Sequence, residues 1–297
     1  QAREYIMRVG EYWIQQGVDG WRLDVPFDVK AEGFWVEFRD RIKAISPEAY
    51  IVGEVWTDAS EWLQGDQVDG VLNYLFSGPA MAFVAKENVD LSLTESVAYF
   101  PYPALDAKGY AEKIDSLLNL YDWEIQQTQL NLLSSHDVAR ALSVMGEDLI
   151  SLKLATLLLM TFPGAPSIYY GDEVGLPGRL DPDCRRGFPK TSDWDKPTLT
   201  AYKALIALRH QHPALRTGKY QTLAAEGDCY VFARLLEKEM VVVAVNTGSE
   251  SVQIRLADMA VENGKVLYGE GTVEWLGDRT AMLSLPARSG MVLGSGC

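Results

Sequence analysis

The chain has 297 residues, of which 47% are hydrophobic and 23% are charged, a composition typical of a soluble globular protein. Its formal net charge of −14 argues against nucleic acid or an anionic membrane as a partner, because both favour a basic surface. The most apolar stretch, residues 154–162, is far too short to span a bilayer. We therefore expect neither a nucleic-acid nor a membrane partner.

Helical and strand patterns alternate over the first two thirds of the chain. The predicted helices cover residues 3–16, 31–45, 149–162 and 199–209. The predicted strands cover residues 20–25, 49–55, 68–75, 129–134 and 167–170, with mixed helical material up to about residue 122. Such alternation predicts a parallel α/β sheet. About five strands fit the later part of an eight-stranded (β/α)8 TIM barrel better than a complete one.

The pattern changes after residue 214 to short strands separated by Gly, Asp and Asn turns. These predicted strands cover residues 229–235, 240–246, 251–256, 265–268 and 280–285. They predict a small all-β sandwich. We expect two domains, a partial catalytic barrel over residues 1–214 and a C-terminal sandwich over residues 215–297.

Three cysteines, Cys184, Cys229 and Cys297, lie far apart and without CxxC spacing. This sparse, odd set predicts free thiols in a reducing compartment, hence a cytoplasmic location. Gln1 begins inside a helical pattern with no initiating Met, which is typical of a cropped or processed chain. Loss of a targeting segment before Gln1 is therefore an open alternative.

A charge pair stands in the otherwise apolar strand at residues 20–25. Side chains alternate along a strand, so Arg22 and Asp24 share one face while Leu23 and Val25 share the other. Charges in a buried strand are costly to desolvate, which leaves two interpretations, a structural ion pair or a site kept for chemistry. In the second, Arg22 would keep Asp24 ionised and oriented, as a carboxylate nucleophile requires.

Acids at three predicted strand ends carry the mechanistic argument: Asp24, Glu54 and Asp137. Catalytic groups of α/β barrels come from the C-terminal ends of different strands, so these acids can converge. A retaining glycosidase needs two carboxyl groups about 5–5.5 Å apart, one a nucleophile and the other an acid/base. Asp24 suits the nucleophile. Glu54, beside apolar Val55, suits the acid because apolar surroundings favour a protonated carboxyl.

Each acid alone also has a simpler interpretation, as a helix N-cap or a surface charge. Three acids at three such strand ends are less easily explained in that way. Asp137 beside His136 would hydrogen-bond sugar hydroxyls.

Three segments resemble conserved motifs of the alpha-amylase family of glycoside hydrolases, in the family's order. They are GWRLDV at 20–25, IVGEVW at 51–56 and NLLSSHD at 131–137. The resemblance implies that Asp24 is the nucleophile, Glu54 the acid/base and Asp137 the residue that stabilises the transition state. It also implies that Arg22 and His136 position the nucleophile and the substrate.

Further segments resemble neopullulanases, cyclomaltodextrinases and maltogenic amylases. They lie at 58–59, 62–67, 73–74, 169–173 and 181–186. This implies retaining hydrolysis of α-1,4 glucosidic bonds, with α-1,6 bonds as an extension, in maltooligosaccharides, cyclodextrins, pullulan or starch. A second possible function is that of a 4-α-glucanotransferase of the same family. The motifs do not distinguish an enzyme that uses water as the acceptor from one that uses a sugar hydroxyl.

Aromatic and basic side chains near these motifs are candidate substrate-binding residues. Trp56, Tyr74 and Tyr170 would stack on glucose rings, although aromatics beside barrel strands are more often part of the core. Arg140 and Arg185 would bind sugar hydroxyls, with a solvated or salt-bridged role equally open. The three histidines have no metal-ligand spacing, so we expect no metal site among these residues.

One motif of the family, an Asp followed by Asn-His on the third strand, has no counterpart in this sequence. The resemblance therefore places strands one to three and the family's usual calcium site before Gln1, and we expect no other cofactor. Five parallel strands leave open edges, which predicts self-association or a complementing N-terminal half-barrel. A catalytically impaired carbohydrate-binding fragment, or one subunit of a split amylase, is the alternative class of function.

Overall fold

Five parallel strands lie side by side in chain order in the computed structural model, which describes residues 1–95, 103–237, 239–257, 259 and 264–294. The strands are β1 Gly20–Leu23, β2 Tyr50–Gly53, β3 Gly70–Asn73, β4 Leu130–Asn131 and β5 Ala165–Pro166. Within these described residues, β1 and β5 are the two edges of the sheet. The predicted parallel α/β sheet is therefore confirmed.

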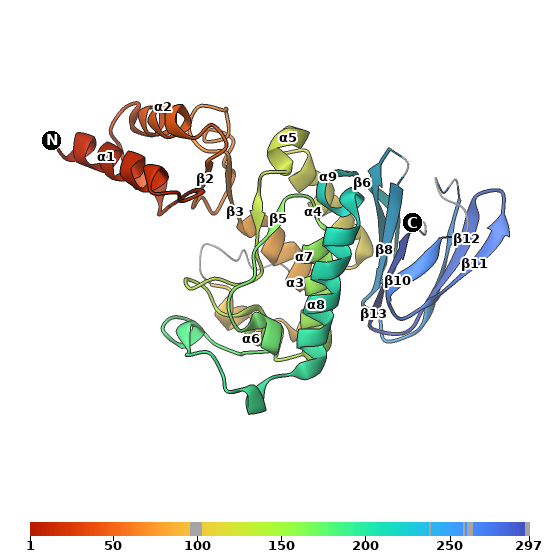
Figure 1. Ribbon diagram of the computed structural model, residues 1–297. Helices are drawn as coiled ribbons and strands as arrows, with labels where there is room; N and C mark the ends of the chain where they lie inside the picture. The colour runs from red at the N-terminus through yellow and green to blue at the C-terminus, as the bar shows by residue number, and fades with distance from the viewer. Residues whose placement is uncertain (96–102, 238, 258, 260–263, 295–297) are drawn as a thin grey trace.

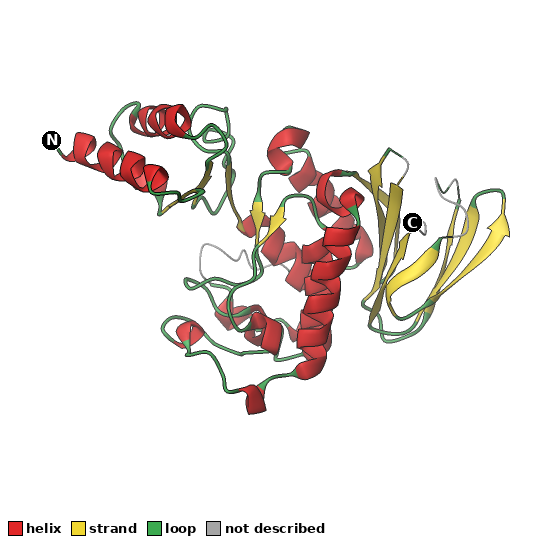
Figure 2. Ribbon diagram, in the orientation of Figure 1, coloured by secondary structure: helices red, strands yellow, loops and turns green. Residues whose placement is uncertain are grey.

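Helices connect and cover these strands (Figures 1 and 2). They are α1 Ala2–Gln15, α2 Phe34–Ile45, α3 Tyr74–Ala85, α4 Ala107–Leu118, α5 Trp123–Gln126, α6 Ala141–Val144, α7 Leu149–Thr161, α8 Lys196–Gln211 and α9 Pro213–Thr217. Asp106, Asp148 and Asp195 begin α4, α7 and α8, and each side chain accepts a hydrogen bond from a first-turn backbone N–H. Figure 1 shows α1 and α2 at the end of the molecule opposite the C-terminal strands.

Two strands begin with glycine because the neighbouring backbone approaches too closely for a side chain. A Cβ atom on Gly20 would lie 1.9 Å from the carbonyl oxygen of Tyr50. A Cβ atom on Gly70 would lie 2.2 Å from the carbonyl oxygen of Thr128. Any larger residue would therefore push these strands apart at their first residue.

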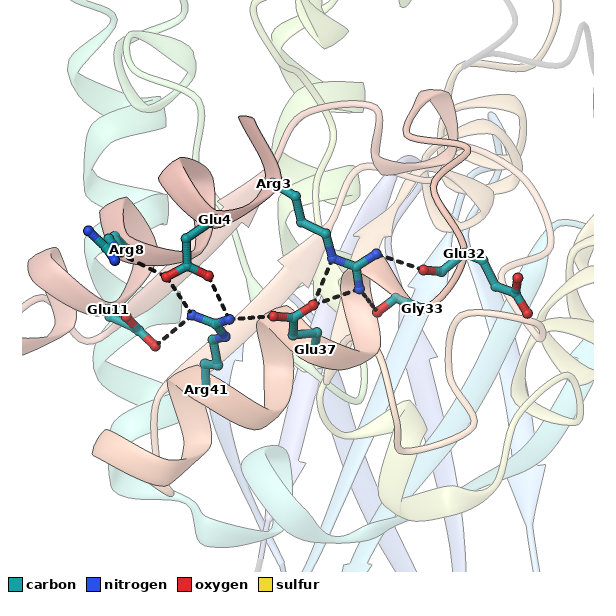
Figure 3. Close-up of polar contacts among 8 residues, drawn as sticks. All are labelled: Arg3, Glu4, Arg8, Glu11, Glu32, Gly33, Glu37 and Arg41. Atoms are coloured by element: carbon teal, nitrogen blue, oxygen red, sulfur yellow. Dashed lines mark hydrogen bonds and ion pairs between the residues drawn. The ribbon is translucent and has the colours of Figure 1, made fainter. Parts of the chain in front are cut away.

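Helices α1 and α2 pack together through one apolar face and one charged rim. Gly10 lets α1 approach α2 so closely that a Cβ atom there would lie 2.6 Å from the ring of Phe38. At the rim, Arg41 of α2 bonds to Glu4 of α1 at 2.9 Å and to Glu37 at 2.5 Å (Figure 3). The opposite face of α1 exposes Tyr5, Ile6, Tyr12 and Trp13.

The C-terminal part consists of two antiparallel sheets. The first contains β6 Lys219–Glu226, β7 Cys229–Leu236, β8 Glu239–Asn246, β10 Lys265–Gly269 and β13 Ser289–Gly294, in the order β10-β13-β8-β7-β6. The second contains β9 Val252–Leu256, β11 Thr272–Gly277 and β12 Thr280–Leu285, in the order β11-β12-β9. The expected C-terminal β sandwich is therefore present.

The central strands β7, β8 and β13 of the larger sheet are buried on both faces, which explains their almost continuous apolar sequences. Along β8, Val241, Val243 and Val245 join the core shared with the helices. The alternate residues Val242 and Ala244 join the core between the two sheets. Since one core spans both parts of the chain, the division at residues 214 and 215 stays a prediction.

Several sequence predictions need correction. The strand expected at 167–170 is wrong, because pairing with β4 occurs at Ala165 and Pro166 and the chain then leaves the sheet. Strands β6, β11 and β13 were not predicted, since their Gly, Glu and Thr residues interrupt the apolar alternation. The expected strand at 68–75 is shorter and continues directly into α3.

Cys184 and Cys229 are free thiols in the structure, as predicted, and Cys297 lies outside the described residues. Among the described helices, none combines the length and the hydropathy needed to cross a membrane. The cytoplasmic location stays a prediction.

Candidate active site

The three predicted acids follow three different strands of the parallel sheet at their C-terminal ends. Asp24 directly follows β1, Glu54 directly follows β2, and Asp137 lies in the loop after β4. Because parallel strands present these ends at one edge, the sheet directs all three loops to the same side. Tyr74, the first residue of α3, follows β3 at this edge as well.

Arg22 contacts two of the acids. One guanidinium nitrogen forms an ion pair with Asp24, and Nη2 lies 2.9 Å from Oε1 of Glu54. The two carboxyl groups differ in accessibility, since the side chain of Asp24 is 78% exposed and that of Glu54 only 3%. The sequence predicted the contact with Asp24. The contact with Glu54 depends on the pairing of β1 with β2.

The carboxylate of Glu54 has a polar environment, which corrects the apolar setting expected from its sequence neighbours. The indole N–H of Trp56 donates to Oε1 at 3.1 Å, and the backbone N–H of Val25 donates to Oε2 at 3.0 Å. With Arg22, three groups orient this buried side chain. A carboxyl group held in this way presents a fixed lone-pair and proton direction, as an acid/base requires.

Val25 adopts a left-handed conformation, with φ of 30° and ψ of 59°. This conformation is strained for a β-branched residue. It turns the Val25 amide toward Glu54, since the hydrogen bond at 3.0 Å comes from this residue. The strained position thus lies between the two candidate catalytic carboxyl groups.

Asp137 is held by its neighbour and by a residue from a distant loop. Nε2 of His136 lies 3.1 Å from Oδ2 of Asp137, and Nη2 of Arg185 lies 3.8 Å from Oδ1. Arg185 also donates from Nε to the carbonyl oxygen of His136 at 2.9 Å. The structure therefore brings the predicted residues His136, Asp137 and Arg185 together.

Tyr74 connects the loops of Glu54 and Asp137. Its hydroxyl donates to Oγ of Ser135 at 2.9 Å, and its ring lies 5.4 Å from that of Trp56. Burial raises the pKa of Tyr74 to about 12, and the negative charges of Glu54 and Asp137 add to the effect. Because its ring is buried, Tyr74 supports these loops and offers no open face for a sugar, unlike the partly exposed Trp56.

Arg140 does not reach the surface, contrary to the expected contact with sugar hydroxyls. Its fully buried guanidinium pairs with Asp172 at 3.0 Å and donates to the carbonyl oxygens of Tyr170 at 2.7 Å and Cys184 at 3.0 Å. These contacts match the salt-bridged alternative. Arg140 thereby joins the loop after β4 to the loop after β5, which carries Arg185.

Asp172 was not identified from the sequence, because nothing in YYGDE distinguishes a buried acid from an exposed one. Burial raises its pKa to about 7, although hydrogen bonding to Ser134 and the charge of Arg140 oppose the shift. Glu173, whose negative charge adds to the increase, also lies near this carboxyl group.

We expect the titration of Asp172 to make folding stability depend on pH. Its pKa is raised from 3.8, so the folded state binds a proton that the unfolded state has lost. The resulting stabilisation is full below pH 3.8 and disappears as the pH rises to about 7. Relative to Asp172→Asn, the unfolding free energy of the unmodified chain should fall by about 2–4 kcal/mol over this window. Urea titrations at several pH values measure it, and parallel curves for the two proteins would contradict it.

No cluster of three or more His, Cys, Asp or Glu side chains is arranged to hold a metal ion in the part of the chain that the structure describes. The site consists of carboxyl, guanidinium, imidazole and aromatic groups. Such groups perform acid/base and nucleophilic chemistry.

Comparison with known proteins shows which family has this combination of fold and acids at strand ends. Residues 1–186 match the model of the alpha-amylase catalytic domain, and residues 218–293 match that of the alpha-amylase C-terminal domain. The chain belongs to the alpha-amylase family. The order of the domains in this amylase-family chain, strands and helices followed by a β part, agrees with that assignment.

Relatives of this amylase-family chain are named neopullulanase and cyclomaltodextrinase. It is 36% identical to neopullulanase 2 of Thermoactinomyces vulgaris over 100% of this chain and 48% of that protein. It is 39% identical to a cyclomaltodextrinase of Geobacillus thermopakistaniensis over 86% of this chain and 41% of the relative. The chain thus spans less than half the length of these relatives.

Two solved structures have similar folds. The debranching enzyme of Nostoc punctiforme is 55% identical, with a TM-score of 0.94 over 99% of this chain and 61% of that one. A cyclic maltosyl-maltose hydrolase of Arthrobacter globiformis is 30% identical, with a TM-score of 0.82 over 99% of this chain and 60% of that one.

Proposed function

We propose that the chain carries the catalytic groups of a retaining glycoside hydrolase for α-1,4 and α-1,6 glucosidic bonds. Its substrates would be maltooligosaccharides, cyclodextrins, pullulan or starch. In this proposal the five parallel strands are strands four to eight of a (β/α)8 barrel. One observation supports this proposal most directly. Asp24 and Glu54 follow neighbouring parallel strands, and both form ion pairs with Arg22.

Each candidate residue has a role in this mechanism. Asp24, exposed and paired with Arg22, attacks the anomeric carbon and forms a covalent glycosyl-enzyme. Glu54 first protonates the departing oxygen and then activates the water that hydrolyses the intermediate. Asp137, held by His136 and Arg185, binds sugar hydroxyls and stabilises the distorted ring of the transition state.

Substrate assays with stereochemical analysis test the proposal. Purified protein is incubated with β-cyclodextrin, pullulan and 4-nitrophenyl maltoside, and the configuration of the first product is followed by NMR. We expect products that keep the α configuration. Products of inverted configuration would contradict the assigned roles. Binding of maltooligosaccharides without hydrolysis would favour the carbohydrate-binding alternative, and longer glucans would indicate transfer to a sugar acceptor.

We also propose that a β/α unit outside residues 1–297, supplied by the part of the relatives that this chain does not match, closes the open edges of the sheet. Three further parallel strands would bring the five strands to the eight of a barrel. The exposed side chains Tyr5, Ile6, Tyr12 and Trp13 of α1 form the apolar face that the new helix would cover. The net charge of −14 disfavours a second copy of this chain as the occupant.

Mixing experiments test this partner. The part of the Nostoc punctiforme debranching enzyme that this chain does not cover is produced separately and added to the chain. We expect a heavier species in sedimentation and faster hydrolysis of 4-nitrophenyl maltoside. Trp13→Glu should weaken the association at least about tenfold, because it places a charge in an apolar contact.

A matched control is Leu276→Glu on β11, because Leu276 and Trp13 are both 48% exposed. This variant should associate like the unmodified chain. A stable dimer of the chain alone that excludes the added half would contradict the proposal and support self-association.

A further inference from the structure

Two cavities lie where helices α3 and α7 meet the C-terminal strands (Figure 1). The first has a volume of about 250 Å³ and lies between the end of α3 and the turns after β6 and β8. The second has a volume of about 300 Å³ and lies between α7 and the strands β10 and β13. Arg288 lines both, and we call the two cavities together the junction groove. Small ligands often bind where two parts of a protein meet, in pockets of about 300–1,000 Å³.

Two residues that line the first cavity have left-handed backbone conformations. The φ angle is 51° for Lys86 and 46° for Arg288. This conformation is unfavourable for a residue with a Cβ atom, and such strain is concentrated at catalytic and binding sites. Its occurrence at two residues of one cavity indicates a shape that is kept for a ligand.

The walls of the junction groove are held by ion pairs between the helical part and the C-terminal part of the chain. Lys86, at the end of α3, pairs with Asp228 at 2.5 Å. Arg288 pairs with Asp148, and its Nη2 also donates to Oγ of Ser151 at 3.0 Å. A ligand would therefore meet a preorganised surface, which lowers the entropic cost of binding.

The charges that line the groove are of both signs, which favours a neutral ligand over an ion. Since Lys86 and Arg288 each have an acidic partner, an anion would have to compete with these ion pairs. In the second cavity, Lys153 and Glu270 carry opposite charges. A neutral ligand needs no such competition, provided that it offers hydrogen-bonding groups to the polar walls.

The remaining side chains of the groove suit a sugar. The exposed Asn88 and Ser249 line the first cavity, and the half-buried Tyr268 lines the second. Amide and hydroxyl groups both donate and accept hydrogen bonds, as the hydroxyl groups of a sugar do. An aromatic ring adds an apolar surface against which the C–H face of a sugar ring packs.

We propose that the junction groove binds a short α-glucan chain at a site separate from the candidate active site. The choice of glucose units rests on the proposed function. The described residues that line the two cavities include none of the candidate catalytic or substrate-binding residues. A chain of two or three sugar units would lie across Arg288 and contact both cavities. It would thereby hold the helices against the C-terminal strands.

Titration calorimetry with maltotriose tests the site on the Glu54→Gln form, which prevents turnover. Asp137→Ala in this form removes a candidate active-site contact, so the binding that it leaves unchanged is assigned to the groove. We expect Asn88→Ala to weaken this binding about fivefold, because one hydrogen-bonding group is lost. Tyr268→Ala should weaken it about tenfold, because the ring is lost, and Tyr268→Phe should stay within about twofold of the parent.

Asn119→Ala is the matched control for the first cavity, because Asn119 is also exposed and lies at the end of α4. It should leave the affinity unchanged. Inorganic phosphate tests whether the groove prefers an anion, and we expect it neither to bind there nor to displace maltotriose.

The outcomes separate this inference from the proposed function, which is measured independently by hydrolysis of 4-nitrophenyl maltoside with Glu54 intact. Normal hydrolysis with a maltotriose affinity that either Asn88→Ala or Tyr268→Ala leaves unchanged would overturn the groove site and leave the function standing. Binding that depends on both residues in a chain that hydrolyses nothing would support the site alone. Displacement of maltotriose by phosphate, or substitution effects confined to thermal stability, would also overturn it.

Discussion

Replacing Asp24 with Asn is expected to lower kcat/KM for 4-nitrophenyl maltoside by about 10⁴-fold or more, the scale found when a catalytic nucleophile is removed. The amide keeps the shape of the side chain and loses the attacking charge. Arg22 would then lose its ion pair with residue 24 and keep the one with Glu54. The measurement is made in the active form, either the chain alone or the chain with its complementing half.

Glu54→Gln should behave differently, because the two carboxyl groups act at different steps. Nitrophenolate departs without a proton, so formation of the glycosyl-enzyme should be reduced less with 4-nitrophenyl maltoside than with maltotriose. Hydrolysis of the glycosyl-enzyme in this variant lacks the general base that Glu54 would provide. We therefore expect a burst of nitrophenol followed by slow turnover. Added azide, a nucleophile that needs no base, should accelerate the slow phase.

Asp19→Asn is the matched control, because this exposed acid precedes the same strand at its opposite end. Its activity should equal that of the unmodified protein. Activity that survives both Asp24→Asn and Glu54→Gln would remove these residues from the mechanism altogether.

Arg140→Met is expected to lower the free energy of unfolding by about 3–5 kcal/mol, which is the cost of breaking a buried ion pair by removing one partner. The change leaves Asp172 buried without its cation. It also leaves the carbonyl oxygens of Tyr170 and Cys184 without the donors that they have now. Urea unfolding followed by circular dichroism measures the loss.

The exposed pair of Arg179 and Asp90 provides the control for this prediction. The side chain of Arg179 is 60% exposed, and the two charges lie 3.3 Å apart. Water and salt screen such a pair, so Arg179→Met should cost no more than about 1 kcal/mol. A similar loss in both variants would show that burial is not what makes Arg140 important.

Most of the parallel sheet could be predicted from the sequence, because β1 and β2 are short apolar runs between helical patterns. The strand expected at 167–170 shows where this reasoning fails. Ser167 still donates to Asn131, but Tyr169 and Tyr170 then turn to pack against Arg140. A local apolar pattern cannot distinguish rings that continue a strand from rings that cover a buried cation.

The candidate site, like the sheet, could be predicted from the sequence only in part. Motif spacing was enough to select Asp24, Glu54 and Asp137, and the structure places them after three parallel strands. Their catalytic roles remain proposals. The arginines could not be separated by sequence, since Arg140 and Arg185 both follow strand ends, yet one is fully buried and the other contacts Asp137.

The sequence by itself selected the candidate catalytic residues and predicted the alternation of strands and helices that directs them to one edge. Those features are local, since they depend on side-chain type and on periodicity along the chain. Only the tertiary structure decided the partners: Glu54 receives donors from Arg22, Val25 and Trp56, and Arg140 is matched with Asp172. Burial and strand register set these contacts, and both arise from residues far apart in the sequence.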